Sequence, residues 1–536
     1  MLKMSFQQDI TIITSSKEFR RMQDKTQLFY SRKSDHYRTR LTHTLEVCDI
    51  ALQIAEKLRN EYASGNKESY LQCKNLDDKL ITAIAYGHDI GHTPFGHIGE
   101  RILSDILGGK DNLGGLIKTD KILKQCFKHN VNSFRILQKD EFKDAKKKKV
   151  SWQTLDGVLK HTKVYKEKTE YEHLDPNVRS DPYQIKKAYS KGVFGGGRKE
   201  LRYLKTLLVK DTGKNFDYYQ HNYALTIEGQ IVALADEIAQ RISDFDDAVR
   251  AGFWKPSKND FSLDGKQIAF YTANRKLIDD LKDVSKSKNN VTEICEKLMQ
   301  YLIDNVEFFP EKMDAQTFKG QEVYFGKCIN FNRRGEETNT IFDKINKDYI
   351  LKCKEIRKCD GISKHVIRQL FKAYYNDVSQ LSDSCLKQLY SDLTKRALAM
   401  LKNPKVHTNT RKYSEDDITD KENHIVDIGN KMAFINSIKS ACLDQDFKVI
   451  EEKLEKVNKS YAIIFSELTK DEDTVRSSSK THKEMLEEID FRKSWLPELH
   501  SIILRNIAFF IAGMTDSFAR DEYQRLYSIK MPMNTY

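Results

Sequence analysis

Residues Ala85 to Glu100 read AYGHDIGHTPFGHIGE, with three histidines and two carboxylates around a turn that contains Pro94. Core packing does not require so many ionisable groups in one short segment. His88 and Asp89 end an apolar helical pattern, where a buried carboxylate is costly unless a cation or another partner stabilises it. The segment therefore predicts a metal-binding site at the end of a helix.

The sequence on either side of this segment has the period of amphipathic helices. Apolar residues recur at steps of three and four, and Pro94 with its neighbouring glycines interrupts the pattern. Only 8 Pro and 24 Gly occur in 536 residues, which favours an all-α fold with few turns. The helices that matter most are expected at 40–58, 80–85, 98–107 and 226–249.

Metal-binding side chains occur on three of these predicted helices. His43 lies on the first, and Asp236 lies on the last. His88 and Asp89 close the second. Imidazole nitrogens with carboxylate oxygens form a ligand set that suits Mn, Fe, Zn or another borderline divalent ion. We expect these four side chains to converge on one cation.

Two spacings extend this site. His97 and Glu100 are three residues apart at a helix start, so the carboxylate can orient the imidazole and raise its basicity. Asp236, Gln240 and Asp244 are spaced i, i+4 and i+8 and share one helix face. One end of that face can hold the metal while the other end meets a substrate.

Composition excludes several classes of protein. With 39% hydrophobic residues the chain can bury a core, and its net charge of +12 is compatible with polyanionic partners. The 9 cysteines are scattered without a C-x-x-C pair, which favours reduced thiols and a cytoplasmic location. The start, MLKMSFQQDITIITSS, lacks the apolar centre of a secretory signal, and no uninterrupted apolar run suggests a membrane partner.

Six ordered blocks resemble the HD-domain phosphohydrolases, and within them the deoxyguanosinetriphosphate triphosphohydrolase branch. The likeness covers residues from about 18 to 250 and the segment 510–527. The blocks are RRMQDKTQLF, RTRLTHTLEV, AYGHDIGHTPFGHIGE, LDGVLKH, EGQIVALADEIAQRISDFDDA and IAGMTDSFARDEYQRL.

The resemblance implies an all-α HD fold and hydrolysis of dGTP, or of several dNTPs, to deoxynucleoside and inorganic triphosphate. Water would attack the α-phosphorus with the help of a divalent ion: Mn, Mg, Fe, Co, Ni or Zn. Matched residue by residue, the metal ligands are His43, His88, Asp89 and Asp236, and the catalytic pair is His97 and Glu100. The resemblance also implies substrate contacts. Gln27 and Asp244 would contact the deoxyribose and its 3′-hydroxyl, and Gln240 would lie near the sugar. The phosphates would be contacted by Arg40, His92, His129 and Lys160.

Three departures from the family pattern occur: two bear on base preference and sugar contacts, and the third bears on a lid or a subunit contact. Gln240 stands where the family often has Tyr, and FKHNVNSFRIL has Lys128 in place of Glu and Asn132 in place of Gln. An irregular insertion occupies about 164–200. All three leave the metal ligands unchanged.

Each candidate residue also has an ordinary structural interpretation. A histidine on a helix face can be a core or cap residue, and an acidic cluster can be a solvated helix end. The residues concerned are His43 in the core or as a cap, His92 bracing the Pro94 turn, His129 as a helix cap, His97 with Glu100 as a loop-ordering pair, Arg40 as an exposed cation at a helix start, Gln27 as an ordinary polar helix residue, and Asp244 at a solvated end.

The chain is expected to comprise a catalytic core over 1–255, a helical accessory or oligomerisation region over 256–499, and a C-terminal helix over 500–536 that packs back on the core. The resemblance implies a homo-oligomer, a tetramer or hexamer, with nucleotide or single-stranded DNA as effector. Two other functions remain open: an HD-domain nucleotidase or phosphodiesterase, and a non-catalytic nucleotide or DNA sensor.

Overall fold

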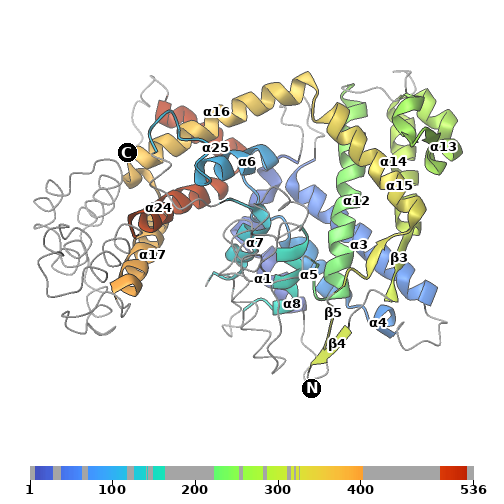
Figure 1. Cartoon of the computed structure of the whole chain (residues 1–536), viewed down its shortest axis with the longest axis horizontal. Coiled ribbons are helices and arrows are strands. Elements are labelled where there is room, and N and C mark those ends of the chain that lie inside the picture. Colours follow the sequence, from blue (N-terminus) through green and yellow to red (C-terminus); the bar gives the residue numbers. More distant parts are fainter. Residues whose placement is uncertain are drawn as a thin grey trace, which may run out of the picture. The chain divides into compact units, whose positions relative to one another are not determined.

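The fold is all-α, as the sequence predicted (Figure 1). The computed structural model describes residues 6–27, 38–62, 71–117, 126–139, 142, 149–162, 223–252, 257–281, 287–310, 315–318, 321–324, 326–401 and 495–527. The insertion expected at 164–200 lies outside these residues. In the described part the strands form three two-stranded antiparallel sheets, which pair β1 with β2, β3 with β6 and β4 with β5.

Four helices that position the site coincide with the periodic segments of the sequence. They are α3 (Arg40–Tyr62), α5 (Asp78–Gly87), α6 (Gly96–Leu107) and α12 (Ile227–Arg250). The predicted helix starts have side-chain caps: Asp77 accepts from the backbone of Lys79 and Leu80, and Thr226 accepts from the backbone of Gly229. The caps satisfy N–H groups that a helix start leaves unpaired.

The remaining elements have the following bounds. Their order is α1 (Gln7–Thr14), α2 (Lys17–Arg21), η1 (Met22–Asp24), α4 (Leu71–Lys74), α7 (His129–Leu137), α8 (Trp152–Lys160), η7 (Lys258–Phe261), β1 (Ser262–Leu263), β2 (Lys266–Gln267), α13 (Ala269–Asp280), α14 (Ser287–Asp304), β3 (Val306–Phe308), β4 (Ala315–Phe318), β5 (Gln321–Tyr324), β6 (Ile329–Phe331), α15 (Arg333–Ile345), the π-helical turn η9 (Asn346–Ile350), α16 (Lys354–Asn376), η10 (Val378–Gln380), α17 (Asp383–Leu401), α24 (Trp495–Ala512) and α25 (Asp516–Tyr527).

Helix α12 is the central element of the core around the site. It contacts α3, α5 and α8 on one side and α14 and α15 on the other. Its apolar side chains Ile231, Leu234 and Ile238 are buried, as the helical period predicted. On α8, a Cβ at Gly157 would lie 2.6 Å from a carbon of Ile84, so the absence of a side chain there lets α8 and α5 approach closely.

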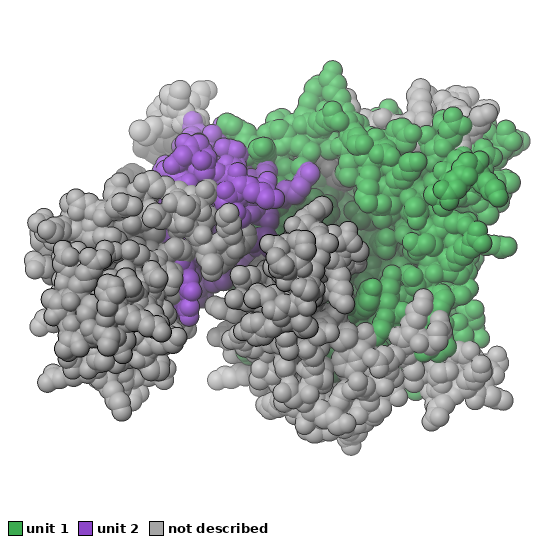
Figure 2. Space-filling view, viewed as in Figure 1, with its two compact units in different colours: residues 1–100, 127–365, 512–520 green, residues 101–126, 366–511, 521–536 purple. Residues whose placement is uncertain are grey.

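The chain divides into two compact units (Figure 2). The first comprises 1–100, 127–365 and 512–520, and the second comprises 101–126, 366–511 and 521–536. The boundary that we expected near 255 does not coincide with this division, because α12 packs against α14 and α15 inside the first unit. The first unit also contains every candidate site residue.

The C-terminal element is two helices rather than the one that we expected. Helices α24 and α25 are separated by a break at 513–515. In the described part of the chain no single helix has the length and apolar character of a membrane span; the bent pair Glu498–Ala512 and Asp516–Tyr527 satisfies these criteria only when the two are taken together.

Candidate active site and metal centre

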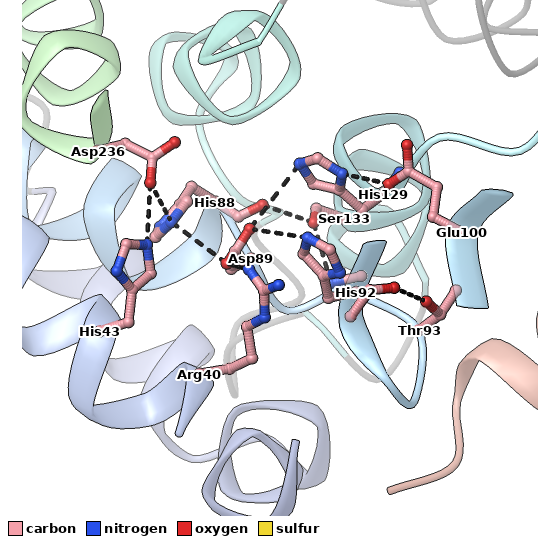
Figure 3. Close-up of polar contacts among 12 residues, drawn as sticks. Arg40, His43, His88, Asp89, His92, Thr93, Glu100, His129, Ser133 and Asp236 are labelled. Atoms are coloured by element: carbon pink, nitrogen blue, oxygen red, sulfur yellow. Dashed lines mark hydrogen bonds and ion pairs between the residues drawn. The ribbon is translucent and has the colours of Figure 1, made fainter. Parts of the chain in front are cut away.

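The predicted metal ligands come together, although they lie on three helices or helix ends (Figure 3). Nε2 of His43 is 2.9 Å from Oδ1 of Asp236. Nε2 of His88 is 3.7 Å from the same oxygen and 3.7 Å from Oδ2 of Asp89. The fold therefore brings ligand atoms of His43, His88 and Asp89 within 4.8 Å of one another and places an oxygen of Asp236 beside the two imidazoles.

The donor atoms fit a divalent cation. Nδ1 of His88 is 2.6 Å from the carbonyl oxygen of Ala85, so this nitrogen carries the proton and Nε2 has a free lone pair. That Nε2 is buried and has no hydrogen-bond partner among the described residues. Ligand atoms of His43, His88 and Asp89 all lie within 4.8 Å of one another. A buried acceptor beside two carboxylates is the environment that a cation stabilises.

Arg40 stabilises this centre electrostatically. Its Nη1 is 2.7 Å from Oδ2 of Asp89, and both side chains are buried. Burial alone would raise the pKa of Asp89, yet the positive charge of Arg40 beside it holds that pKa well below its usual value. Arg40 is therefore a buried partner of Asp89, which remains an anion, and the contact of Arg40 with a phosphate stays a prediction.

Glu100 has a different partner from the one that we expected. Its Oε2 is 2.5 Å from Nδ1 of His129 and also accepts the backbone N–H of His129 at 3.2 Å. Burial would raise the pKa of Glu100, but His129 lowers it below its usual value. Burial would lower the pKa of His129, but Glu100 raises it. The result is an imidazolium–carboxylate pair, because each group favours the charged form of the other.

The rings of His97 and His92 lie next to the His129 ring. The His97 ring is exposed, and its centroid lies 5.1 Å from that of His92 and 6.0 Å from that of His129. The buried His92 ring stacks on His129 at 4.1 Å, with Nε2 3.8 Å from Oδ1 of Asp89. Burial and the positive charge of Arg40 hold the pKa of His92 well below its usual value, so His92 is neutral.

His161 belongs to the site and was absent from the predicted set. Its Nε2 is 3.2 Å from Nε2 of His129, while its Nδ1 is 2.7 Å from the carbonyl oxygen of Val158. Its ring also meets the His88 ring edge-to-face at 5.1 Å. The sequence contained a signal, because His161 ends the block LDGVLKH directly after Lys160.

The Lys160 ammonium forms an ion pair with Asp156. It is buried and 3.1 Å from Oδ1 of Asp156, one turn earlier on α8. Asp156 in turn accepts the backbone N–H of Leu225 at 2.6 Å. The structure thus gives Lys160 a part in packing α8, and contact with the polyphosphate stays a prediction.

The residues predicted to meet the sugar lie on α12 and in the segment that follows η1. On α12, Asp244 is buried and Gln240 is half-buried, two turns and one turn beyond Asp236. Gln27 is 8% exposed, and its side-chain oxygen has no hydrogen-bond partner among the described residues. Its backbone carbonyl accepts from Arg40 at 3.4 Å.

The two departures in FKHNVNSFRIL have structural consequences at the site. The Lys128 ammonium is 3.2 Å from Oε1 of Glu100. The Asn132 amide donates to the carbonyl of Gly91 at 2.8 Å. A Cβ at Gly91 would lie 2.1 Å from the backbone nitrogen of Ser133, so α7 packs directly on the turn after His88.

Asp516 holds the loop around the site from a distant part of the chain. One of its oxygens accepts from the backbone N–H of Phe95 at 2.8 Å, and the other accepts from the backbone N–H and hydroxyl of Thr26 at 3.0 and 2.5 Å. It is buried and contacts the two segments that carry Gln27 and His97. These contacts give Asp516 a structural role in packing the two segments together.

Comparison with known proteins agrees with this geometry. The HD-domain family model matches residues 40–240, a span that contains all four predicted metal ligands. Proteins named deoxyguanosinetriphosphate triphosphohydrolase-like protein are similar to this chain. One from Nitrobacter hamburgensis is 28% identical over 70% of this chain and 80% of the relative. One from Caldanaerobacter subterraneus subsp. tengcongensis is 28% identical over 71% of this chain and 75% of the relative. One from Brucella anthropi is 34% identical over 46% of this chain and 47% of the relative. The comparisons therefore identify an HD domain at residues 40–240, and over about 70% of its length the chain is similar to deoxyguanosinetriphosphate triphosphohydrolase-like proteins.

Proposed function

We propose that this protein is a metal-dependent triphosphohydrolase that converts dGTP, or a small set of dNTPs, to deoxynucleoside and inorganic triphosphate. The observation that carries the proposal is the convergence of His43, His88, Asp89 and Asp236 beside the charged pair of Glu100 and His129. The names of the related proteins support dGTP as the substrate.

The four converging side chains would hold the divalent ion. When bound, such an ion polarises a phosphoryl oxygen or lowers the pKa of a water molecule. Two imidazoles with two carboxylates favour Mn or another borderline ion over Mg, which prefers oxygen ligands.

The remaining residues supply charge and proton transfer. His129 is held as a cation by Glu100, and Arg40 is a second buried cation, so both offset the negative charge of a triphosphate. His97 is exposed beside them and is the histidine most accessible to a proton of the attacking water or of the leaving group. His92 is neutral and can donate or accept a hydrogen bond at the phosphates.

Product analysis tests the proposal. The purified protein is incubated with each dNTP and NTP in the presence of Mn or Mg, and the products are separated by ion-exchange chromatography. Inorganic triphosphate and deoxynucleoside support the proposal. Orthophosphate or pyrophosphate would indicate an HD-domain nucleotidase or phosphodiesterase, and binding without turnover would indicate a nucleotide sensor.

A homo-oligomer, a nucleotide or single-stranded DNA effector and a cytoplasmic location belong to the same proposal. Analytical ultracentrifugation with and without dGTP tests the first. Initial rates with added nucleotides or oligonucleotides test the second.

A further inference from the structure

Helix α12, which carries Asp236, is joined to α15 and η9 by a ladder of polar contacts. The two partners in each contact are separated by the same number of residues, so α12 and α15 run parallel in constant register. On α12 the contacts recur at i, i+4 and i+7, which places them along one face. They join the Asn339 amide to Glu237 at 3.0 Å, Arg241 to Asp343 at 2.8 Å, and the Asn346 amide to Asp244.

The third contact differs from the first in its burial. The Glu237 side chain is 38% exposed, whereas Asp244 is 3% and Asn346 is 5% exposed. Asp244 lies two turns beyond Asp236 on α12, so this buried contact is formed by the helix that carries a candidate metal ligand. The ladder therefore changes from a surface contact at Glu237 to a buried contact at Asp244.

The chemistry of the pair fixes the orientation of the Asn346 amide. An ionised carboxylate only accepts hydrogen bonds, so the nitrogen of Asn346 must face Asp244. The oxygen of the same amide then points elsewhere. It is buried and has no hydrogen-bond partner among the described residues. A buried acceptor without a donor indicates a place where a hydroxyl of a ligand, or a water molecule, completes the contact.

Asn346 begins a π-helical turn directly after α15. A π-turn displaces the side chains that follow it from the register of an α-helix, and such turns occur frequently at functional sites. The turn brings an amide from residues outside the predicted catalytic core onto the candidate sugar contact. It thus connects the region over 256–499, expected to be an accessory or oligomerisation region, to the candidate substrate contact on α12.

We propose that Asn346 is a positioning residue that sets the recognition of the sugar 3′-hydroxyl by Asp244. This inference rests on the proposed dNTP triphosphohydrolase function. The Asn346 amide holds one carboxylate oxygen of Asp244, so the other oxygen keeps a fixed direction toward the hydroxyl donor. Without the amide, Asp244 can rotate and the hydroxyl loses a prealigned acceptor.

Steady-state kinetics with dGTP and with 2′,3′-dideoxy-GTP test the role of Asn346. The variants are Asn346→Ala, Asn346→Asp and the matched control Asn339→Ala, which removes the equivalent amide two turns earlier on the same face of α15. A hydrogen bond from the 3′-hydroxyl to a charged acceptor should make wild-type protein prefer dGTP about tenfold or more. We expect both Asn346 variants to reduce that preference to less than about threefold, chiefly through a higher KM for dGTP. Asn339→Ala should retain the wild-type preference.

The outcomes separate the two proposals. If Asn346→Ala lowers the rates with both nucleotides equally, or if Asn339→Ala reduces the preference as much, Asn346 has no positioning role. If Asn346→Ala does not fold, the preference of the isosteric Asn346→Asp for dGTP over 2′,3′-dideoxy-GTP decides whether Asn346 has a positioning role. If wild-type protein releases no triphosphate from any dNTP, the proposed function fails and the role of Asn346 fails with it.

Discussion

The carboxylate of Glu100 lies 2.5 Å from Nδ1 of His129, which is 29 residues away in the sequence. The pair is buried, and each partner stabilises the charged form of the other. A cation held in this way beside a metal centre needs no reorganisation when negative charge develops on a substrate. The sequence spacing suggested His97 as the partner of Glu100, whereas the fold gives that place to His129.

Replacing Glu100 with Gln should therefore remove the charge of His129 near neutral pH. Glu100 raises the pKa of His129, so its loss lowers that pKa and leaves the imidazole neutral at pH 7. We expect kcat to fall by at least about 100-fold at pH 7 and the remaining activity to shift to lower pH. A pH–rate profile measures both effects. Lys128→Ala is the control, since Lys128 contacts the same carboxylate from a more exposed position; an equal loss in that variant would contradict the assignment.

His161 should act through His129. Its Nδ1 is fixed by the carbonyl of Val158, so Nε2 has a lone pair that accepts the proton of His129 Nε2. Replacing His161 with Phe removes this acceptor and should lower kcat about 10-fold or more, with KM little changed. Metal content by mass spectrometry is the control measurement. Loss of the metal in His161→Phe would show that the residue supports the metal site rather than His129.

The helices could be predicted because their apolar residues repeat locally. The period over 40–58 and 226–249 depends only on the face that each helix buries, and α3 and α12 follow it. The convergence of His43 and Asp236 was predicted from their metal-binding chemistry and from the family resemblance, because local spacing cannot relate side chains that are 193 residues apart. Local spacing alone offers several partners for each histidine.

The partners of Glu100 and Asp244 show what local spacing misses. Both carboxylates take a partner from another element, 29 residues away for His129 and 102 residues away for Asn346. Such contacts depend on which helices pack together and in which register, and a single sequence does not specify that. The same reason explains why the boundary expected near 255 did not match the compact units.

Removing Asp236 should abolish metal binding. Asp236 contributes an oxygen 2.9 Å from Nε2 of His43 and 3.7 Å from Nε2 of His88, so Asp236→Ala leaves those two imidazoles with Asp89 alone. We expect the bound metal to fall by about 10-fold or more and turnover to be lost. Inductively coupled plasma mass spectrometry of the purified proteins measures this. Gln240→Ala is one turn along the same helix face and should keep the metal; equal loss in both variants would argue against the assigned ligands.

Replacing Asp516 with Ala should destabilise the fold around the site. The change leaves the N–H groups of Thr26 and Phe95 without their acceptor in a buried place. We expect the free energy of unfolding to fall by about 2–4 kcal/mol. Chemical denaturation followed by circular dichroism measures it. The neighbouring Ser517→Ala loses a half-buried hydrogen bond to Asp24 and should cost less than about 1 kcal/mol, so similar losses in both would contradict this role for Asp516.

Lys25 should make stability depend on pH. The Lys25 ammonium is buried and donates to the carbonyls of His92 and Ala512, and burial lowers its pKa to about 7 despite the nearby Asp516. The unfolded chain, in which the lysine pKa is about 10.4, therefore binds more protons than the folded chain between these two values. Stability contributed by this group should rise as pH increases from about 7 toward 10. Replacing Lys25 with Met removes this titrating group. The unfolding free energy of wild type should therefore increase relative to that of Lys25→Met when the pH is raised from 7 to 9. Urea denaturation at both pH values tests this, and a difference that stays constant would show that Lys25 keeps an ordinary pKa in the folded protein.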